Sequence, residues 1–292
     1  MVKNTIEKLL RDGINIIKKR DYNNPFLDVQ LMLSYLLKKD KIYLHMHMNE
    51  EVEECVSGKY YEMVERRNVG YPLQYMINSQ EFMGLDFFIQ EGVLVPRPDT
   101  ETLVEKIVKV VNQSDMKNKK IKILDIGTGS GAIALSLAHY LKNSDVTAMD
   151  ISEIAIETAR INVNKLNLSN VSIIKADIFG QTDILNEHNE KYDIVVSNPP
   201  YIEHDVIEGL QIEVSQFEPK IALDGGSDGL DFYRQIIRVF NKIHAEESLL
   251  SVEIGCDQMQ TVTEIFESIN IFNKIDADKD LSGQYRVVTG FL

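Results

Sequence analysis

Residues 121–141, IKILDIGTGSGAIALSLAHYL, carry the strongest indication of the fold class. This stretch opens as an apolar strand, turns through three closely spaced glycines and continues as a helix-forming run. Strand and helix patterns alternate after it, with strands at 145–149, 171–175 and 192–197 and a helix at 153–166. This alternation predicts a mostly parallel, doubly wound α/β sheet of the Rossmann-like kind.

The end of the chain departs from this alternation. Residues 249–254, 271–275 and 285–291 all have strand patterns, and no helical pattern separates the last two. Strands joined without a helix between them form a hairpin. We therefore predict an antiparallel terminal strand at or near the edge of the sheet.

The first part of the chain has a different character. Apolar residues recur at spacings of three and four within 6–17 and again after Asn24-Pro25, which predicts a small helical bundle. The pattern of residues 81–89 changes to short strands around Gly84. The predicted organisation is a helical domain at 1–80, a β-hairpin linker at 81–94 and an α/β domain at 95–292.

The composition excludes several classes of protein. The 292 residues include 31 Lys+Arg and 45 Asp+Glu, a net charge of -14, which disfavours a protein that coats nucleic acid. A 44% hydrophobic, 26% charged chain is typical of globular proteins. No apolar run approaches the roughly 20 residues that span a bilayer, and no signal-peptide pattern is present. We expect a cytoplasmic protein that does not bind membranes.

No metal site or disulfide is predicted. Cys55 and Cys256 lie far apart and have no paired-ligand spacing. His45 and His47 lie in a Met-rich stretch that is typical of a partly exposed helix end.

The glycine-rich loop lies between a strand and a helix, where the backbone passes close to a ligand and a Cβ would block it. The predicted cofactor contacts in this loop are Gly127, Thr128, Gly129, Ser130 and Gly131. Asp150, at the end of the next strand, is placed to accept bonds from ribose hydroxyls. Asp177 follows the third strand and is either an acceptor for an adenine amino group or a solvated turn. The loop alone does not separate a nicotinamide dinucleotide from S-adenosylmethionine.

The tetrapeptide Asn198-Pro199-Pro200-Tyr201 follows the fourth strand, so it reaches the same edge of the sheet as the glycine loop. The Asn198 side-chain oxygen and the Pro199 carbonyl can accept both N–H bonds of a planar NH2 group in an amide or an aminopurine. Holding that nitrogen with its lone pair toward an electrophilic methyl group lowers the barrier to transfer. Tyr201 is placed to cover the planar group.

These features predict an enzyme that methylates an amino group. The predicted catalytic residues are Asn198, Pro199 and Tyr201, and the predicted substrate-binding residues are Asn198, Pro199, Pro200 and Tyr201. An isolated proline turn with an Asn cap is the structural alternative for the same residues.

The chain resembles, over essentially its whole length, the HemK/PrmC type of protein-(glutamine-N5) methyltransferase that acts on peptide chain release factors. Besides the glycine loop and the tetrapeptide, the resemblance rests on Gln74-Tyr75, Val95–Glu101, Glu218–Leu230 and Gly283–Arg286. It implies an S-adenosylmethionine-dependent catalytic domain, a helical domain that helps to dock the release factor, and a Gly-Gly-Gln glutamine as the acceptor. It also places Ile178 beside the adenine and Asn198 in contact with the cofactor. We expect a monomer that makes no direct contact with nucleic acid.

Some positions depart from the family pattern or have two interpretations. Asp99 stands where the family usually has Glu, and Ile178 stands where some members have an aromatic residue. Asn78 stands where a Gly often follows the Gln-Tyr segment in the family. Arg97 either binds a carboxylate or braces the site. The Glu218-Pro219 segment is either a lid over the site or an ordinary packed loop.

Two other functions compete with glutamine methylation. One is adenine-N6 methylation of DNA or RNA, because the same tetrapeptide can present an aminopurine. The acidic balance argues against it, since phosphate contacts supply much of the affinity for nucleic acid. The other is a non-catalytic module that binds release factors or the ribosome and retains the cofactor fold.

Overall fold

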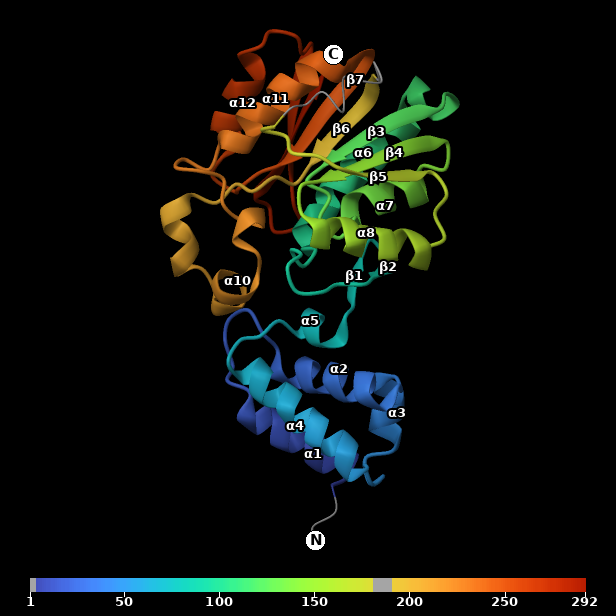
Figure 1. Ribbon diagram of the computed structural model, residues 1–292, viewed down its shortest axis with the longest axis vertical. Coiled ribbons are helices and arrows are strands. Elements are labelled where there is room, and N and C mark those ends of the chain that lie inside the picture. The colour runs from blue at the N-terminus through green and yellow to red at the C-terminus, as the bar shows by residue number, and fades with distance from the viewer. Residues whose placement is uncertain (1–3, 181–190) are drawn as a thin grey trace. The chain divides into compact units, whose positions relative to one another are not determined.

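The computed structural model describes residues 4–180 and 191–292. It forms two compact units, Met1–Ser79 with Leu210–Phe217, and Gln80–Gly209 with Glu218–Leu292 (Figure 1). Among the described residues, no helix has both the length and the apolar character that crossing a bilayer requires.

The first unit is a bundle of short helices. They are α1 (Ile6–Ile16), α2 (Pro25–Leu37), α3 (Lys41–Met46), α4 (Glu54–Asn68), α5 (Leu73–Ile77) and α10 (Ile212–Phe217). The side chains of Thr5 and Asn24 cap α1 and α2 by accepting backbone N–H bonds. Helices α1, α2 and α4 pack together around Leu9, Met32 and Tyr60, which are fully buried. The predicted helical bundle is confirmed.

The α10 segment belongs to this unit although it lies far along the chain. Arg67, which is 4% exposed, pairs with Asp28 at 2.7 Å and with Glu213 of α10 at 3.0 Å. The rings of Tyr71 and Phe217 meet edge to face at 5.3 Å. The predicted division of the chain did not include this segment, because no local pattern relates it to helices far upstream.

The second unit contains a seven-stranded sheet. Its strands are β3 (Ile121–Ile126), β4 (Ser144–Asp150), β5 (Val171–Lys175), β6 (Tyr192–Ser197), β7 (His244–Glu253), β8 (Lys274–Lys279) and β9 (Tyr285–Phe291). They lie in the order β5-β4-β3-β6-β7-β9-β8, and β9 is antiparallel to both of its neighbours whereas β3 to β7 pair in parallel. The Rossmann-like sheet with an antiparallel terminal strand is confirmed. The strand order reverses between β3 and β6, the position where such sheets bind ligands.

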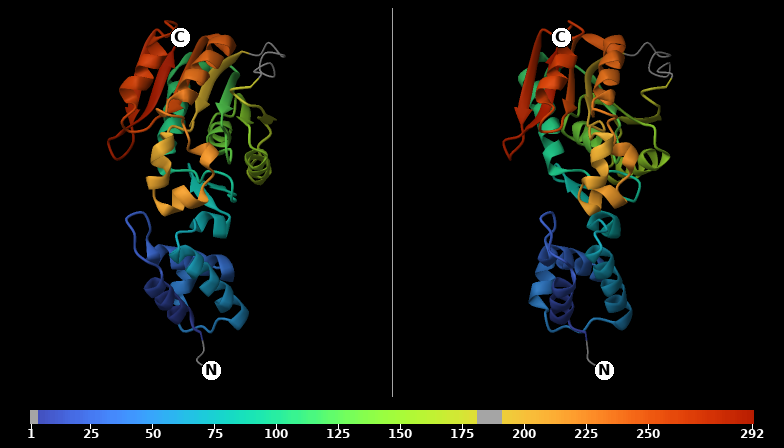
Figure 2. Two further views of the ribbon diagram at one scale, coloured as in Figure 1. Left: turned by 60° about the vertical axis from the view of Figure 1, so that its left-hand side comes forward. Right: turned by 90° about the vertical axis from the view of Figure 1, so that its left-hand side faces the viewer.

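Helices cover both faces of the sheet (Figure 2). They are α6 (Glu101–Gln113), α7 (Ala132–Tyr140), α8 (Glu153–Lys165), α11 (Asp231–Ile243) and α12 (Met259–Glu267). Helices α6, α7 and α8 contact one another in that order, and α11 contacts α12. A core cluster joins α11 and α12 to the strands through buried residues such as Leu124, Val195, Phe240 and Phe266. The sheet is thus buried, which gives the strand ends a fixed frame.

The hairpin of β1 (Gln80–Phe82) and β2 (Leu85–Phe87) turns where Met83 and Gly84 both have positive φ angles, 53° and 69°. The Met83 N–H donates to the Glu101 carboxylate at 2.6 Å, and the Tyr140 hydroxyl donates to the Met83 carbonyl at 2.6 Å. These bonds tie the hairpin to α6 and α7. The division into units therefore differs from the predicted one, because the hairpin is part of the second unit and not a separate linker.

Asn78, which departs from the family pattern, lies at a position with an unusual backbone conformation. Asn78 ends α5 with a φ of 51°, in the left-handed region. Glycine is favoured there, and Asn is the side chain that tolerates it best.

Candidate active site

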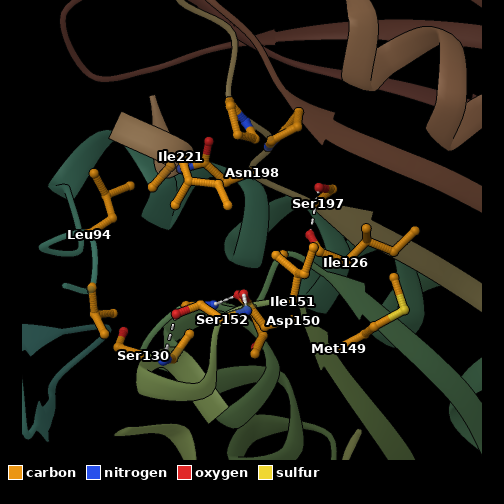
Figure 3. Close-up of a pocket in the computed structure, with 18 of the residues that line it drawn as sticks. Leu94, Ile126, Ser130, Met149, Asp150, Ile151, Ser152, Ser197, Asn198 and Ile221 are labelled. Atoms are coloured by element: carbon orange, nitrogen blue, oxygen red, sulfur yellow. Dashed lines mark hydrogen bonds between the residues drawn. The ribbon is translucent and has the colours of Figure 1, made fainter. Parts of the chain in front are cut away.

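A pocket of about 330 Å³ opens at the carboxyl ends of the central strands of the second unit (Figure 3). That volume suits a nucleoside-sized ligand. Of the residues predicted from the sequence, the lining includes Gly127, Thr128, Gly129, Ser130, Asp150, Asp177, Ile178, Asn198, Pro199 and Pro200. Gly131 and Tyr201 are not among the described residues that line the pocket.

The glycine loop follows β3 in a conformation that its glycines permit. Gly127 and Gly129 have φ angles of +73° and +56°, and a Cβ added to Gly127 would meet no atom within 4 Å. The backbone therefore faces open space that a ligand can enter. Gly131 has a φ of +86°, and a Cβ there would lie 3.0 Å from Leu135, so this glycine serves helix packing.

Asp125 holds the loop from behind. Its Oδ2 accepts from the Thr128 hydroxyl at 2.6 Å and from the Ala134 N–H at 3.2 Å. Burial raises the pKa of Asp125 to about 7, although these two hydrogen bonds favour the charged form.

Asp150 ends β4 and connects two parts of the pocket wall. Its Oδ2 accepts from the Gly129 N–H at 2.8 Å, and its Oδ1 accepts from the Ser152 N–H at 2.9 Å. Burial raises the pKa of Asp150. A carboxylate oxygen has two lone pairs, so each oxygen retains a site for a ribose hydroxyl.

Asp177 lies in the pocket wall and also caps its own turn. Its Oδ1 accepts from the Phe179 N–H at 2.8 Å, so the two interpretations of this residue are compatible. Phe179 and Phe232 meet edge to face at 5.0 Å and both line the pocket. Although Ile178 is aliphatic, the aromatic surface in this wall comes from these two rings.

The tetrapeptide lies level with the glycine loop because β6 pairs with β3. Ser197 pairs with Ile126, and the Ser197 hydroxyl donates to the Ile126 carbonyl at 2.7 Å. Figure 3 shows Asn198 and Ile221 across the pocket from Asp150. The Asn198 Nδ2 donates to the Thr100 hydroxyl at 3.2 Å, which leaves the Asn198 oxygen available to accept a hydrogen bond.

Comparisons with known proteins show the family to which the chain is similar. Residues 117–277 match the model of a methyltransferase domain, and residues 8–77 match that of the PrmC N-terminal domain. The release factor glutamine methyltransferase of Clostridium acetobutylicum is 41% identical over 284 residues, which are 97% of each chain. That of Fusobacterium nucleatum is 39% identical over 281 residues, 96% of this chain and 77% of the relative. This chain belongs to the release factor glutamine methyltransferase family.

A solved structure supports the fold. The human methyltransferase 10 domain containing protein aligns with a TM-score of 0.51 and 20% identity, over 71% of this chain and 88% of that one. The resemblance drawn from the motifs is confirmed, and the chain is a methyltransferase, an enzyme class that uses S-adenosylmethionine.

Tyr201 is oriented away from the pocket of this methyltransferase. Its ring packs against the core cluster, and its hydroxyl lies 3.4 Å from the Glu253 Oε1. Burial raises the pKa of Tyr201 far above its usual value. The prediction that Tyr201 covers the acceptor group requires a side-chain movement and stays a prediction.

The segment after the tetrapeptide forms part of the pocket wall through Pro219, Ile221 and Ala222. Arg97 bonds to the buried Glu218 carboxylate at 2.7 Å, which favours the bracing role among its two interpretations. Gly225 packs so closely that a Cβ would lie 2.8 Å from the Tyr201 Cα. These contacts fix the segment against the tetrapeptide.

Asp99 points toward the terminal strand. It pairs with Arg286 at 3.4 Å, and its side chain is 49% exposed, so the pair is weak. Arg286 also bonds to the buried Asp280 at 3.1 Å.

Several supporting residues of the site were missed in the sequence. Asn162 of α8 donates to the Ser130 and Phe88 carbonyls, both at 2.9 Å, and accepts from the Phe88 N–H. Gln258 donates to the Tyr201 carbonyl at 3.0 Å. The only indication of such residues in the local sequence is a polar residue inside an amphipathic pattern. This pattern does not identify the residue to which the polar side chain bonds.

No group of three or more His, Cys, Asp or Glu side chains is arranged to hold a metal ion in the part of the chain that the structure describes.

Proposed function

We propose that this methyltransferase transfers the methyl group of S-adenosyl-L-methionine to the side-chain amide nitrogen (N5) of the glutamine in the Gly-Gly-Gln loop of peptide chain release factors. The observation that carries the proposal is the placement of Asn198. Its side chain lines the same pocket as the glycine loop, and its nitrogen is bonded to Thr100, so its oxygen faces an incoming N–H group. Family membership supports glutamine as the acceptor.

The residues of the pocket fit the cofactor. Gly127 leaves open space where a side chain would obstruct a ligand, and Asp150 retains acceptor sites for the ribose. Asp177 and the rings of Phe179 and Phe232 form a wall that suits a purine. When bound, S-adenosylmethionine supplies an electrophilic methyl group on a sulfonium sulfur.

The tetrapeptide supplies positioning and electrostatic stabilisation. The Asn198 oxygen and the Pro199 carbonyl accept the two N–H bonds of the glutamine amide, which fixes the amide plane. An amide nitrogen is a poor nucleophile because its lone pair is delocalised, and the two acceptors stabilise the positive charge that develops as it attacks. The pair of prolines limits backbone movement at this point. The amide proton leaves after methyl transfer, so no strong general base is required.

The proposal includes the setting of the reaction. The chain acts on release factors as a cytoplasmic monomer, makes no direct contact with nucleic acid and supports translation termination. The helical first unit contributes to docking the release factor. The net charge of -14 supports a protein acceptor over a nucleobase.

Mass spectrometry tests the proposal directly. Purified protein is incubated with S-adenosylmethionine and a release factor, and the peptide that contains the Gly-Gly-Gln loop is measured before and after. We expect a gain of one methyl group on the glutamine, and none when that glutamine is changed to Ala. Methylation of DNA under the same conditions, with an unmodified loop peptide, would contradict the proposal.

A further inference from the structure

The tetrapeptide is held by side chains at both of its ends. At the first end, the Asn198 side chain bonds to Thr100. The two prolines that follow have no N–H group, so no hydrogen bond donated by their own backbone can hold them. At the other end, the Tyr201 carbonyl accepts from the Gln258 Nε2 at 3.0 Å. The position of this carbonyl therefore depends on Gln258.

The neighbours of the Gln258 side-chain amide fix its orientation. Its Oε1 accepts from the Gly255 N–H at 3.0 Å, and the Tyr233 hydroxyl lies 3.2 Å from the same oxygen. A backbone N–H can only donate, so the atom that faces Gly255 is the amide oxygen, and the NH2 group lies on the other side. That group donates to the carbonyls of Tyr201 and, at 3.3 Å, Gly229. Both of its hydrogens are thus used on the backbone of the site.

Gln258 precedes α12, but its side chain does not serve that helix. It is the N-cap residue, a position where a side chain usually accepts from an N–H group of the first turn. Within the described residues, its side chain makes no such bond. The contact with the tetrapeptide is close, because a Cβ added to Gly229 would lie 2.4 Å from the Tyr201 carbonyl oxygen and 2.8 Å from the Gln258 Nε2. The contacts of the side chain are therefore with the segments beside the pocket.

A shift of the Tyr201 carbonyl would be passed on to the acceptor site. Pro200 lies between the Tyr201 and Pro199 carbonyls, and its ring fixes φ, so few dihedral angles are free to absorb the shift. The Pro199 carbonyl and the Asn198 oxygen are the two proposed acceptors for the glutamine amide. They have to keep their spacing to hold one planar NH2 group.

We infer that Gln258 is a positioning residue for methyl transfer, which holds the Tyr201 carbonyl and, through Pro200, keeps the Pro199 carbonyl in line with the acceptor amide. It does not touch the reacting atoms. The inference rests on the proposed function and deepens it, because it explains how the second acceptor of the tetrapeptide is aligned.

Two variants test the inference. Gln258→Met removes the NH2 group and the oxygen while keeping a similar volume. Gln258→Glu keeps an oxygen for the Gly255 N–H and replaces the NH2 group with a second oxygen. At a pH well above the usual pKa of a carboxyl group, neither variant can donate to the Tyr201 carbonyl. We expect each to lower kcat by up to about 100-fold, because a small misplacement of a positioning group has an effect of that size. The KM for the release factor and the Kd for S-adenosylmethionine should stay close to wild type.

The value of kcat is calculated per cofactor-binding site, counted by calorimetry, so that misfolded protein does not lower it. Gln260→Met is the matched control, since it makes the same substitution two positions along the chain. Gln260 is exposed and donates to Glu264 at 3.1 Å, so kcat should not change. An equal fall in kcat for Gln260→Met, or a wild-type rate for Gln258→Glu, would overturn the inference.

Gln235→Met provides a comparison with the other side of the pocket. The Gln235 Nε2 donates to the carbonyl of Ile178, which lines the pocket beside Asp177, at 2.7 Å. Loss of this hydrogen bond should raise the Kd for S-adenosylmethionine by about 2- to 10-fold and leave kcat at saturating cofactor close to wild type. If Gln258→Met raised this Kd and spared kcat in the same way, Gln258 would support cofactor binding and the inference would be wrong.

A measurement without turnover separates this inference from the proposed function. The sequence contains one Tyr-Ile pair, Tyr201-Ile202. Protein labelled with 13C in the Tyr carbonyls and 15N in Ile therefore gives one HNCO cross-peak, whose 13C shift reports the hydrogen bonding of the Tyr201 carbonyl. We expect this peak to move in Gln258→Met and Gln258→Glu but not in Gln260→Met.

A peak that stays in place in Gln258→Met, or that moves while kcat stays at the wild-type value, would overturn the role of Gln258. An unmodified release factor after incubation with the wild type would instead contradict the proposed function.

Discussion

The two walls of the pocket are built in different ways. In the wall formed at the ends of β3, β4 and β5, the acids bond to backbone N–H groups of the loops at these strand ends, as Asp150 does with Gly129 and Ser152. In the wall formed by the tetrapeptide, the side chains bond to residues far away in sequence, as Asn198 does with Thr100 and Tyr201 with Glu253. The first wall is held by bonds within its own strand-end loops, and the second depends on elements outside the strand ends.

The difference corresponds to what each wall has to do. Cofactor binding requires a backbone that approaches closely and a few acceptors, and a short loop after a strand supplies both. Aligning a neutral amide requires one side-chain oxygen in a fixed orientation. A side chain is fixed best when its remaining polar atom is bonded to a rigid element, here the start of α6. The comparison predicts that damage to the first wall weakens binding, whereas damage to the second slows the chemistry.

The largest effect is expected for Asn198→Ala. It removes the oxygen that accepts from the amide, and the loss of one such preorganised group typically lowers kcat by about 100- to 1000-fold. The Kd for S-adenosylmethionine, measured by calorimetry, should change little. Asn164→Ala, at an exposed position of α8, is the control and should leave both quantities unchanged. A Kd that weakens in parallel with kcat would show that the two walls are not separable.

Asp150→Ala should have the next largest effect, and this effect should be on cofactor binding. It removes both acceptor oxygens, and hydrogen bonds to a charged group contribute about 1.5–3 kcal/mol, so we expect cofactor affinity to fall about 10- to 100-fold. With saturating cofactor, kcat should recover. Asp145→Ala, near the other end of β4, removes an exposed carboxylate and is the control. A kcat that stays low at saturation would assign Asp150 to the chemistry instead.

Gly129→Val should weaken cofactor binding less. A β-branched residue at a φ of +56° is strained by roughly 1–2 kcal/mol, so the loop shifts and the affinity falls about 5- to 30-fold. Gly58→Val places the same side chain in α4, where a Cβ meets no atom within 4 Å, and should not affect the cofactor. Wild-type affinity in Gly129→Val would show that the loop is not part of the cofactor site.

The same contrast explains how much could be predicted from the sequence. The glycine loop, Asp150 and the tetrapeptide are visible because each follows a strand, and parallel strands bring their carboxyl ends to one edge. Thr100, Glu253 and Gln258 are not visible, because their partners are set by strand order and register. The α10 segment was missed for the same reason, since Glu213 meets Arg67 only in the folded chain. Tyr201 was assigned to the pocket from its position, whereas in the structure its ring packs against the core cluster and its hydroxyl lies 3.4 Å from the Glu253 Oε1.

Asp125, a buried acid behind the first wall, affects the pH dependence of stability. Burial raises the pKa of Asp125 to about 7 in the folded state, whereas an unfolded Asp titrates near about 3.9. The folded state therefore binds a proton that the unfolded state has released, so this contribution to stability is complete below about pH 4 and is lost as the pH rises toward 7. Urea unfolding at several pH values measures it.

Asp125→Asn should flatten that decline, because the amide does not titrate, even if the variant is less stable at every pH. Glu105→Gln, at an exposed position of α6, is the control and should keep the wild-type slope. Glu253 has a pKa raised in the same direction, so Glu253→Gln should flatten the remaining slope. If the effects of the two changes on the pH slope of stability were not additive, the two walls would be coupled through the ends of β3, β6 and β7. We would then expect cofactor binding and kcat to change together in the Asn198 and Asp150 variants.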